Sequence, residues 1–187
     1  MPKADKKPKA DISWITDELL NALAWQESKF DPKAQSKSGA MGLYQWMPAF
    51  FERGEAIGFG VPTGKFDPTD PVESRKRTKA YLEGLQKYYP TWDPTEVLMA
   101  YNWGHSNVNK LHTGQMNMDE YMAQGEWERR KAAEAMNYAP KILKHLKDRP
   151  YKDLLYRLEP TPIQDLLDRG EPSTYMLLDE DPFASTI

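Results

Sequence analysis

Hydrophobic positions recur at helical spacing near the start of the chain, and this pattern predicts a helix. The first apolar stripe consists of Leu19, Leu20, Leu23 and Ala24. Residues three and four apart share one face of a helix, so this stripe marks a buried side. Thr16 or Asp17 is a suitable N-cap, and Pro32 disfavours helical geometry at the residue before it. We therefore expect a first helix from about residue 16 to about residue 30.

Two later helices are predicted by the same four-residue pattern, which is Asp-Pro-Val-Glu at 70–73 and Asp-Pro-Thr-Glu at 93–96. The aspartate suits the N-cap, proline suits the first helical position, and glutamate suits the third. The expected apolar face of the first of these helices carries Tyr81, Leu82, Leu85, Tyr88 and Tyr89. Gly104 is a natural stop for the second helix.

The remaining segments predict loops and further helices, without strands. Residues 33–40 are small and polar, Pro48 can open a short helix, and the glycines and prolines of 54–70 indicate an irregular connection. Residues 118–147 favour two or three helices, with Gly125 and Pro140 as interruptions or kinks. Convincing period-two alternation is absent from the sequence. The predicted fold class is all-α, or mainly α.

Length and charge suggest one domain with a tail at each end. The chain has 187 residues, a size that can bury one substantial core. We expect a flexible basic arm at 1–11, a catalytic domain at 12–150 and an acidic, proline-punctuated extension at 151–187. The sequence has no cysteine, so disulfides and thiol chemistry are excluded. Neither a nucleic-acid footprint nor an apolar run long enough to span a membrane is present.

Glu27 is the strongest candidate for chemistry. It continues the apolar stripe formed by Leu19 and Leu23. Burial disfavours the ionised form of a carboxyl and raises its pKa, which is what a general acid working near neutral pH requires. Taken alone, however, a glutamate at a helix end can equally turn to solvent.

Four short motifs follow in order and give the chain a specific resemblance. They are Glu-Ser at 27–28 with the Ser36 loop, Gly-Leu-Tyr-Gln at 42–45, Ala-Tyr-Asn-Trp-Gly at 100–104, and Asn-Tyr-Ala-Pro at 137–140. Together, over about residues 14–147, they resemble the soluble lytic transglycosylase (SLT) family. The resemblance implies a lysozyme-like helical domain that cleaves the β-1,4 bond between N-acetylmuramic acid and N-acetylglucosamine in peptidoglycan. It also implies a 1,6-anhydromuramoyl product.

The resemblance assigns expected roles to several residues. Glu27 is expected to be the single general acid and base, with no metal or organic cofactor. A hydroxyl from Tyr101 or Tyr138 is expected to orient it, because a buried acid needs a hydrogen-bond partner. The expected substrate-binding residues are Ser36, Gln45, Met47, Tyr101, Asn102 and Tyr138. The chain departs from the family at Tyr44, where methionine is frequent, and at Trp103, where a small residue is usual.

Each of these residues also has an ordinary structural interpretation. Ser28 can be a surface residue at the helix end that bonds the local backbone, and Ser36 can be an ordinary polar residue of the loop. Gln45 can be a buried amide whose hydrogen bonds are satisfied. Core packing can account for Met47, Tyr101 and Tyr138, and helix capping can account for Asn102. The three histidines, His105, His112 and His145, are expected to be surface or structural residues. A second carboxylate from Asp31 or Glu52 also stays open.

Two other functions stay open at the sequence level. One is a goose-type-like muramidase, in which water replaces the C6 hydroxyl. The other is a non-catalytic glycan-binding or structural virion protein on the same fold. The polar first residues contain no signal peptide, so we expect delivery to the periplasm by another machine. Phage virion-associated transglycosylases resemble this domain, and residues 151–187 are a candidate docking segment for a virion, lysis or secretion protein.

Overall fold

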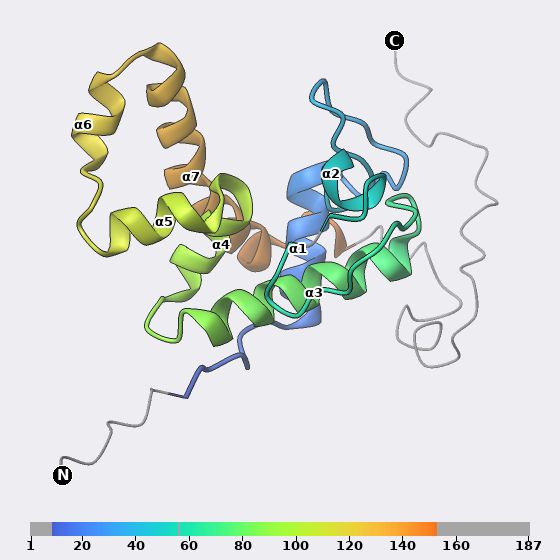
Figure 1. Cartoon of the computed structure of the whole chain (residues 1–187). Helices are drawn as coiled ribbons and strands as arrows, with labels where there is room; N and C mark the ends of the chain where they lie inside the picture. The colour runs from blue at the N-terminus through green and yellow to red at the C-terminus, as the bar shows by residue number, and fades with distance from the viewer. Residues whose placement is uncertain (1–8, 56, 153–187) are drawn as a thin grey trace.

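The computed structural model describes residues 9–55 and 57–152, and these residues contain seven α-helices (Figure 1). The helices are α1 (Asp17–Ser28), α2 (Pro48–Phe51), α3 (Pro71–Tyr88), α4 (Pro94–Trp103), α5 (His105–His112), α6 (Met118–Ala123) and α7 (Glu126–Asp148). Extended pairing in this part of the chain is limited to two isolated bridges, Gln35 with Met41 and Met41 with Trp46. The mainly α class is therefore confirmed. Most of the predicted basic arm and acidic extension lies outside the described residues.

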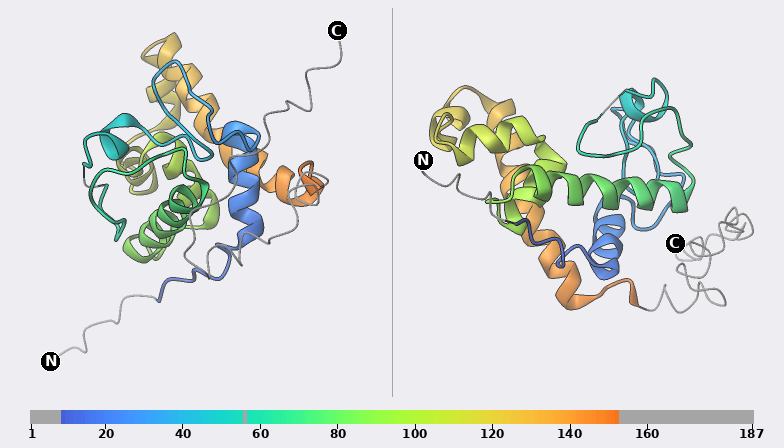
Figure 2. Two further views of the ribbon diagram at one scale, coloured as in Figure 1. Left: turned by 90° about the vertical axis from the view of Figure 1, so that its right-hand side faces the viewer. Right: turned by 60° about the horizontal axis from the view of Figure 1, so that its bottom comes forward.

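Helix α1 begins and buries its face as its sequence predicts. The Thr16 hydroxyl accepts a hydrogen bond from the amide of Leu19 at 3.2 Å, which caps the helix. The side chains of Leu20 and Leu23 are fully buried, and α1 packs against α7 and α3 (Figure 2). The helix ends at Ser28, because Lys29 adopts a left-handed backbone with φ of 57°. The catalytic candidate Glu27 therefore lies in the last turn.

Helices α3 and α4 begin at the two predicted N-caps. The Asp70 carboxylate accepts hydrogen bonds from two backbone amides in the first turn of α3, at 2.9 and 3.2 Å. In α4 the bonding is reciprocal, because Asp93 and Glu96 each accept from the other's backbone amide at 2.9 Å. Both cappings satisfy amides that have no partner within the helix.

The prediction for the apolar face of α3 is wrong at its last turn. Tyr81, Leu82 and Leu85 are buried, whereas Tyr88 is 67% exposed. Residue 88 lies nearly on the same face as residue 81, but the last turn of α3 extends past the core. Tyr88 makes edge contacts with the rings of Phe59 and Tyr89, with centroids 5.3 and 4.8 Å apart. Helical spacing predicts the direction of a side chain and cannot show where the core ends.

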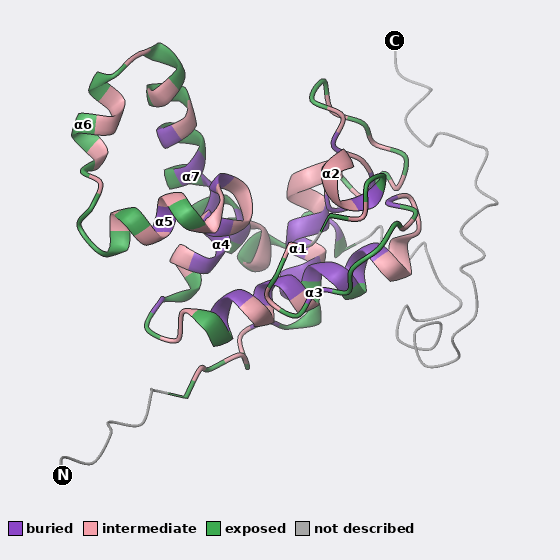
Figure 3. Cartoon of the chain, in the orientation of Figure 1, coloured by how far each residue is buried: buried purple, intermediate pink, exposed green. Residues whose placement is uncertain are grey.

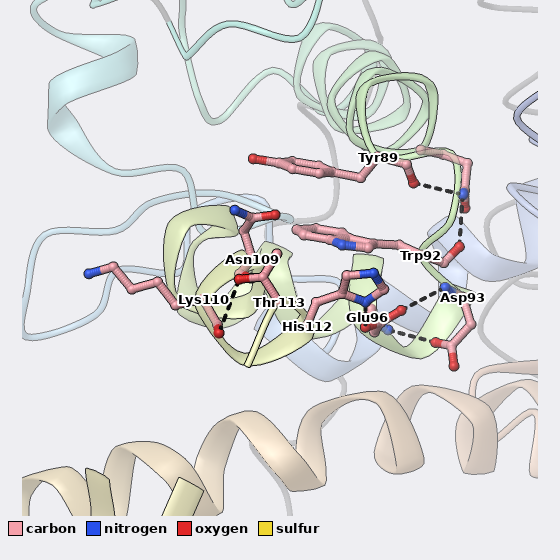
Figure 4. Close-up of polar contacts among 9 residues, drawn as sticks. Tyr89, Trp92, Asp93, Glu96, Asn109, Lys110, His112 and Thr113 are labelled. Atoms are coloured by element: carbon pink, nitrogen blue, oxygen red, sulfur yellow. Dashed lines mark hydrogen bonds and ion pairs between the residues drawn. The ribbon is translucent and has the colours of Figure 1, made fainter. Parts of the chain in front are cut away.

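Stacked rings fix the connection from α3 to α4 and α5 (Figure 4). The rings of Tyr89 and Trp92 are parallel, with centroids 3.8 Å apart. Nδ1 of His112, the last residue of α5, lies 2.6 Å from the Glu96 carboxylate of α4. His112 thus makes a structural contact between two helices, in agreement with the role expected from the sequence.

The second half of the chain differs from the prediction directly after Gly104. Gly104, with φ of 87°, ends α4 as expected, but α5 begins directly at the next residue and was not predicted. Gly125 separates α6 from α7, whereas Pro140 lies inside the continuous helix α7. A proline deprives the carbonyl four residues earlier of its partner. Here both Pro140 and Met136 are exposed, so water can satisfy that carbonyl and the helix continues.

Buried residues gather where α1, α3, α4 and α7 face one another (Figure 3). Helix α7 packs against both α1 and α4. Helix α6, by contrast, has no buried residue. The core therefore brings the end of α1, the end of α4 and the middle of α7 together, and these three segments carry the motif residues Glu27, Tyr101 and Tyr138.

Candidate active site

Glu27 lies at the meeting point of α1 and α7. Its side chain is partly accessible, and the hydroxyl of Tyr138 donates a hydrogen bond to its Oε1 atom. Tyr138 is itself buried, with 4% of its surface exposed. The expected tyrosine contact with Glu27 is therefore present, and Tyr138 makes it from a position 111 residues away in the sequence.

The surroundings of Glu27 raise the pKa of its carboxyl from an ordinary 4.5 to about 7. Burial is the main cause, since it disfavours the charged form, and the negative charge of Glu134 acts in the same direction. The Tyr138 hydrogen bond and the positive charge of Lys29 lower the pKa but do not outweigh burial. Both the protonated and the ionised form of Glu27 are thus accessible near neutral pH, so the group can both give and accept a proton.

Tyr101 supports Tyr138 from α4. The two rings are nearly parallel, with centroids 6.3 Å apart and an interplanar angle of 16°. The Tyr101 hydroxyl donates to the backbone carbonyl of Tyr44 at 2.8 Å. Burial, followed by the nearby charge of Glu27, raises the pKa of both Tyr101 and Tyr138 well above the ordinary value. Both hydroxyls therefore keep their protons and act as donors.

The loop after α1 is held to the helix by side chains of the predicted motifs. The Ser28 hydroxyl lies 3.1 Å from the Leu43 carbonyl and donates to it. The Gln45 amide donates to the carbonyls of Ala34 and Gly42, at 3.3 and 3.1 Å. Gln45 is therefore a satisfied amide within the loop, which is the structural interpretation left open by the sequence.

The two other loop residues differ in how they are placed. The Ser36 hydroxyl accepts from the amide of Ala40 at 3.0 Å and lies 2.9 Å from the Ser38 hydroxyl. Met47 is 41% exposed and precedes α2. Ser36 is thus bonded within its own loop, whereas Met47 presents a flexible apolar side chain to solvent, as an adaptable contact for a ligand requires.

Glu134 is a charged neighbour of the site that the sequence reasoning missed. Its Oε1 accepts from the Asn102 amide at 3.3 Å, and its Oε2 lies 3.1 Å from the Lys131 ammonium. The acids weighed from the sequence, Asp31 and Glu52, are not among the groups that shift the pKa of Glu27, whereas Glu134 is. A usable signal existed, because Glu134 lies four residues before Tyr138 and so shares its helix face.

Comparison with known families identifies the family of the chain. Residues 7–124 match the family described as Transglycosylase SLT domain. The chain belongs to this family. The match includes α1 with Glu27 and α4 with Tyr101, and it ends before α7, which supplies Tyr138. The family predicted from the ordered motifs is therefore confirmed.

Curated relatives carry transglycosylase names. A membrane-bound lytic murein transglycosylase F of Yersinia pestis (strain Pestoides F) is 34% identical over 108 residues, which are 55% of this chain and 20% of that protein. The peptidoglycan transglycosylase gp16 of Escherichia phage T7 is 31% identical over 100 residues, which are 53% of this chain and 7% of that protein. The chain thus matches only a small part of each relative's length. No solved structure matches.

The described residues offer neither a metal site nor a membrane-spanning helix. No group of three or more histidine, cysteine, aspartate or glutamate side chains in this part of the chain is placed to hold a metal ion. Within residues 9–55 and 57–152, no helix has both the length and the apolar character needed to cross a membrane.

Proposed function

We propose that this chain is a peptidoglycan lytic transglycosylase that cleaves the β-1,4 bond between N-acetylmuramic acid and N-acetylglucosamine. The observation that carries the proposal is the Glu27 carboxyl, which has a pKa of about 7 and one oxygen bonded to Tyr138. Membership of the SLT family and the names of the relatives support the same reaction.

In the first step, Glu27 acts as a general acid. The Tyr138 hydroxyl occupies Oε1, which leaves Oε2 to carry the proton to the glycosidic oxygen. The C1–O bond breaks, and the N-acetylglucosamine side departs as an alcohol. The remaining muramic sugar becomes oxocarbenium-like, and its own N-acetyl group stabilises it in place of a second protein carboxylate.

In the second step, the Glu27 carboxylate acts as a base. It takes the proton from the C6 hydroxyl of the same muramic sugar while the C6 oxygen attacks C1. This closes the 1,6-anhydro ring and returns Glu27 to its protonated form, so no water is consumed. A pKa near 7 suits both steps, because each form of the carboxyl is then accessible at neutral pH.

Glu134 is poorly suited to the role of a second catalytic carboxylate. One of its oxygens accepts from Asn102 and the other pairs with Lys131. Burial alone would raise the pKa of Glu134, but these hydrogen bonds outweigh it and lower the pKa. Glu134 is therefore a fixed anion near the site, and we assign it no covalent role.

Product analysis tests the type of reaction. Purified peptidoglycan sacculi are digested with the protein, and the released fragments are measured by mass spectrometry. We expect muropeptides that end in 1,6-anhydromuramic acid, which are lighter by one water than hydrolysis products. Fragments with a reducing muramic end would instead show that the protein is a muramidase.

A pair of substitutions tests the assigned acid. Glu27→Gln should lower the rate of fragment release by at least about 10³-fold, because the amide cannot donate the required proton. Glu52→Gln is the matched control at one of the other acids weighed from the sequence, and it should keep the wild-type rate. Retained activity in Glu27→Gln would show that the acid is misassigned. Wild-type protein that binds sacculi without cleaving them would be a glycan-binding protein.

The proposal also covers where the protein acts and how it reaches the cell wall. We propose that the protein acts on the cell wall from the periplasmic side and is delivered by a phage particle or a lysis system. The similarity to a transglycosylase of Escherichia phage T7 supports this, and residues 151–187 are the proposed docking segment. Mass spectrometry of purified particles is the test. Detection of the protein only in the cytosol of lysing cells would indicate an endolysin instead.

A further inference from the structure

Helix α3 carries a buried arginine whose guanidinium makes four hydrogen bonds. Nη1 of Arg75 donates to the Asn21 side chain at 2.9 Å and to the Tyr44 hydroxyl at 3.1 Å. Nη2 donates to the backbone carbonyl and the carboxylate of Asp17, at 3.1 and 3.0 Å. Only 7% of the Arg75 surface is exposed. The arginine therefore ties the start of α1 to the loop that contains Tyr44.

Tyr44 extends this network toward the candidate active site. Its ring is buried, with 1% of its surface exposed. Its hydroxyl is held by Arg75 at one end, and its backbone carbonyl accepts from the Tyr101 hydroxyl at the other. Tyr101 stacks on Tyr138, and Tyr138 donates to Glu27. A continuous series of contacts thus connects Arg75 to the carboxyl of Glu27.

Stability alone is a weak explanation for Arg75. A buried ion pair often contributes no more stability than well-packed apolar side chains of the same volume, because removing the charges from water is costly. The carboxylate partner here, Asp17, is 55% exposed. The contact region also contains a cavity of about 30 Å³ lined by Asn21, Tyr44 and Arg75 among others. What the network does provide is fixed geometry, since a planar guanidinium holds several acceptors in set directions.

We propose that Arg75 and Tyr44 are positioning residues for the catalytic carboxyl, acting through Tyr101 and Tyr138. Arg75 fixes the ring of Tyr44, and the backbone of Tyr44 fixes the hydroxyl of Tyr101. Tyr101 then supports the ring of Tyr138 so that its hydroxyl reaches Oε1 of Glu27. The catalytic consequence rests on the proposed transglycosylase reaction, whereas the effect on the titration of Glu27 does not.

The Tyr44→Phe variant is the main test, because it removes one hydroxyl and keeps the ring and the backbone carbonyl. A looser Tyr138 stabilises the ionised carboxyl of Glu27 less well, so the titration midpoint of Glu27 should rise by about 0.5–1 pH unit. The midpoint is measured by NMR with ¹³C-labelled glutamate, assigned by comparison with Glu27→Gln. On sacculi, kcat should fall several-fold while KM changes little.

Tyr81→Phe is the matched control on α3. Tyr81 is also buried, and its hydroxyl makes no hydrogen bond to any described residue. The titratable groups that face Glu27 are Lys29 after α1, Tyr101 on α4, and Glu134 and Tyr138 on α7. Both Tyr44→Phe and Tyr81→Phe keep all four of these side chains. The control should leave the titration midpoint and kcat unchanged.

Arg75→Lys provides a second, independent variant. An ammonium keeps the charge but cannot hold Asp17 and Tyr44 with the same geometry, so the midpoint of Glu27 should move upward as in Tyr44→Phe. The double variant should shift it no further than the larger single shift, because both substitutions break one series of contacts. Additive shifts would contradict the proposed series.

The outcomes separate the two proposals. If Tyr44→Phe lowers the melting temperature but leaves the titration midpoint of Glu27 and kcat at their wild-type values, Tyr44 is merely structural. The positioning proposal is then wrong. If the midpoint shifts as expected but wild-type protein does not cleave sacculi, the positioning of Glu27 stands and the proposed function fails.

Discussion

The surroundings of Glu27 and of Glu134 differ in a way that assigns the two acids different chemistry. Burial raises the pKa of Glu27 to about 7, and the single hydrogen bond from Tyr138 does not reverse this. At Glu134, bonds from Lys131 and Asn102 overcome a smaller effect of burial and lower the pKa. The side chain of Glu134 is also half exposed. The balance between burial and donors, not proximity to the site, thus decides which carboxyl can donate a proton.

The largest change in the pKa of Glu27 is expected from Tyr138→Phe, which removes the donor to Glu27 and keeps the ring against Tyr101. Losing a hydrogen bond to a charged group should raise the pKa of Glu27 by about one unit and lower kcat by about 10–100-fold. Initial rates on labelled sacculi from pH 4 to 9 measure both changes. Tyr121→Phe on α6 is the control. An unchanged pH profile in Tyr138→Phe would mean that the hydroxyl does not act on Glu27.

The next largest effect concerns stability. The pKa of Glu27 is about 7 in the folded protein and ordinarily 4.5, so between these values the folded state binds more protons than the unfolded state. Stability contributed by this group therefore falls as pH rises from about 4.5 to about 7 and stays low above it. Glu27→Gln should then be more stable than wild type by about 2 kcal/mol at pH 8 and nearly equal at pH 4.5.

Urea unfolding at these two pH values measures that difference. Glu52→Gln, at an exposed position, should match wild type at both. If Glu27→Gln did not raise the free energy of unfolding at pH 8, the Glu27 carboxyl would be solvated. Glu27 and Glu134 would then no longer differ in how burial affects their pKa.

Glu134→Gln should change the pH profile in the direction opposite to Tyr138→Phe. The negative charge of Glu134 raises the pKa of Glu27, so its removal should lower the titration midpoint of Glu27 by a few tenths of a unit. The ¹³C NMR titration detects such a shift. Glu128→Gln, also on α7, is the control for removing one charge, and an equal shift there would indicate a general effect of net charge.

The smallest effect is expected from Lys131→Ala. The Lys131 and Glu134 side chains are 43% and 50% exposed, and exposed pairs contribute little because water screens them. The free energy of unfolding should change by less than about 0.5 kcal/mol. A loss above 1 kcal/mol in urea unfolding would show that Glu134 is held more tightly than its exposure indicates.

Local sequence signals predicted the helix starts well. Thr16, Asp70 and Asp93 all cap helices as expected, because a cap depends on a side chain and amides two or three residues away. The error at Tyr88 and the choice left open at Pro140, between an interruption and a kink, both depend on what packs around the helix. The tertiary arrangement decides whether the end of α3 meets the core. It also decides whether water reaches the Met136 carbonyl, which Pro140 deprives of its partner.

The sequence by itself determined the helical class, the family and the identity of Glu27 as the leading acid, because these depend on local spacing and on motifs in a fixed order. Only the tertiary structure decided that Tyr138 rather than Tyr101 bonds Glu27, that the charge of Glu134 raises the pKa of Glu27, and that Arg75 is linked to the site through Tyr44. The physical reason is that a pKa and a hydrogen bond depend on distances of a few ångströms between segments far apart in the chain, here up to 111 residues.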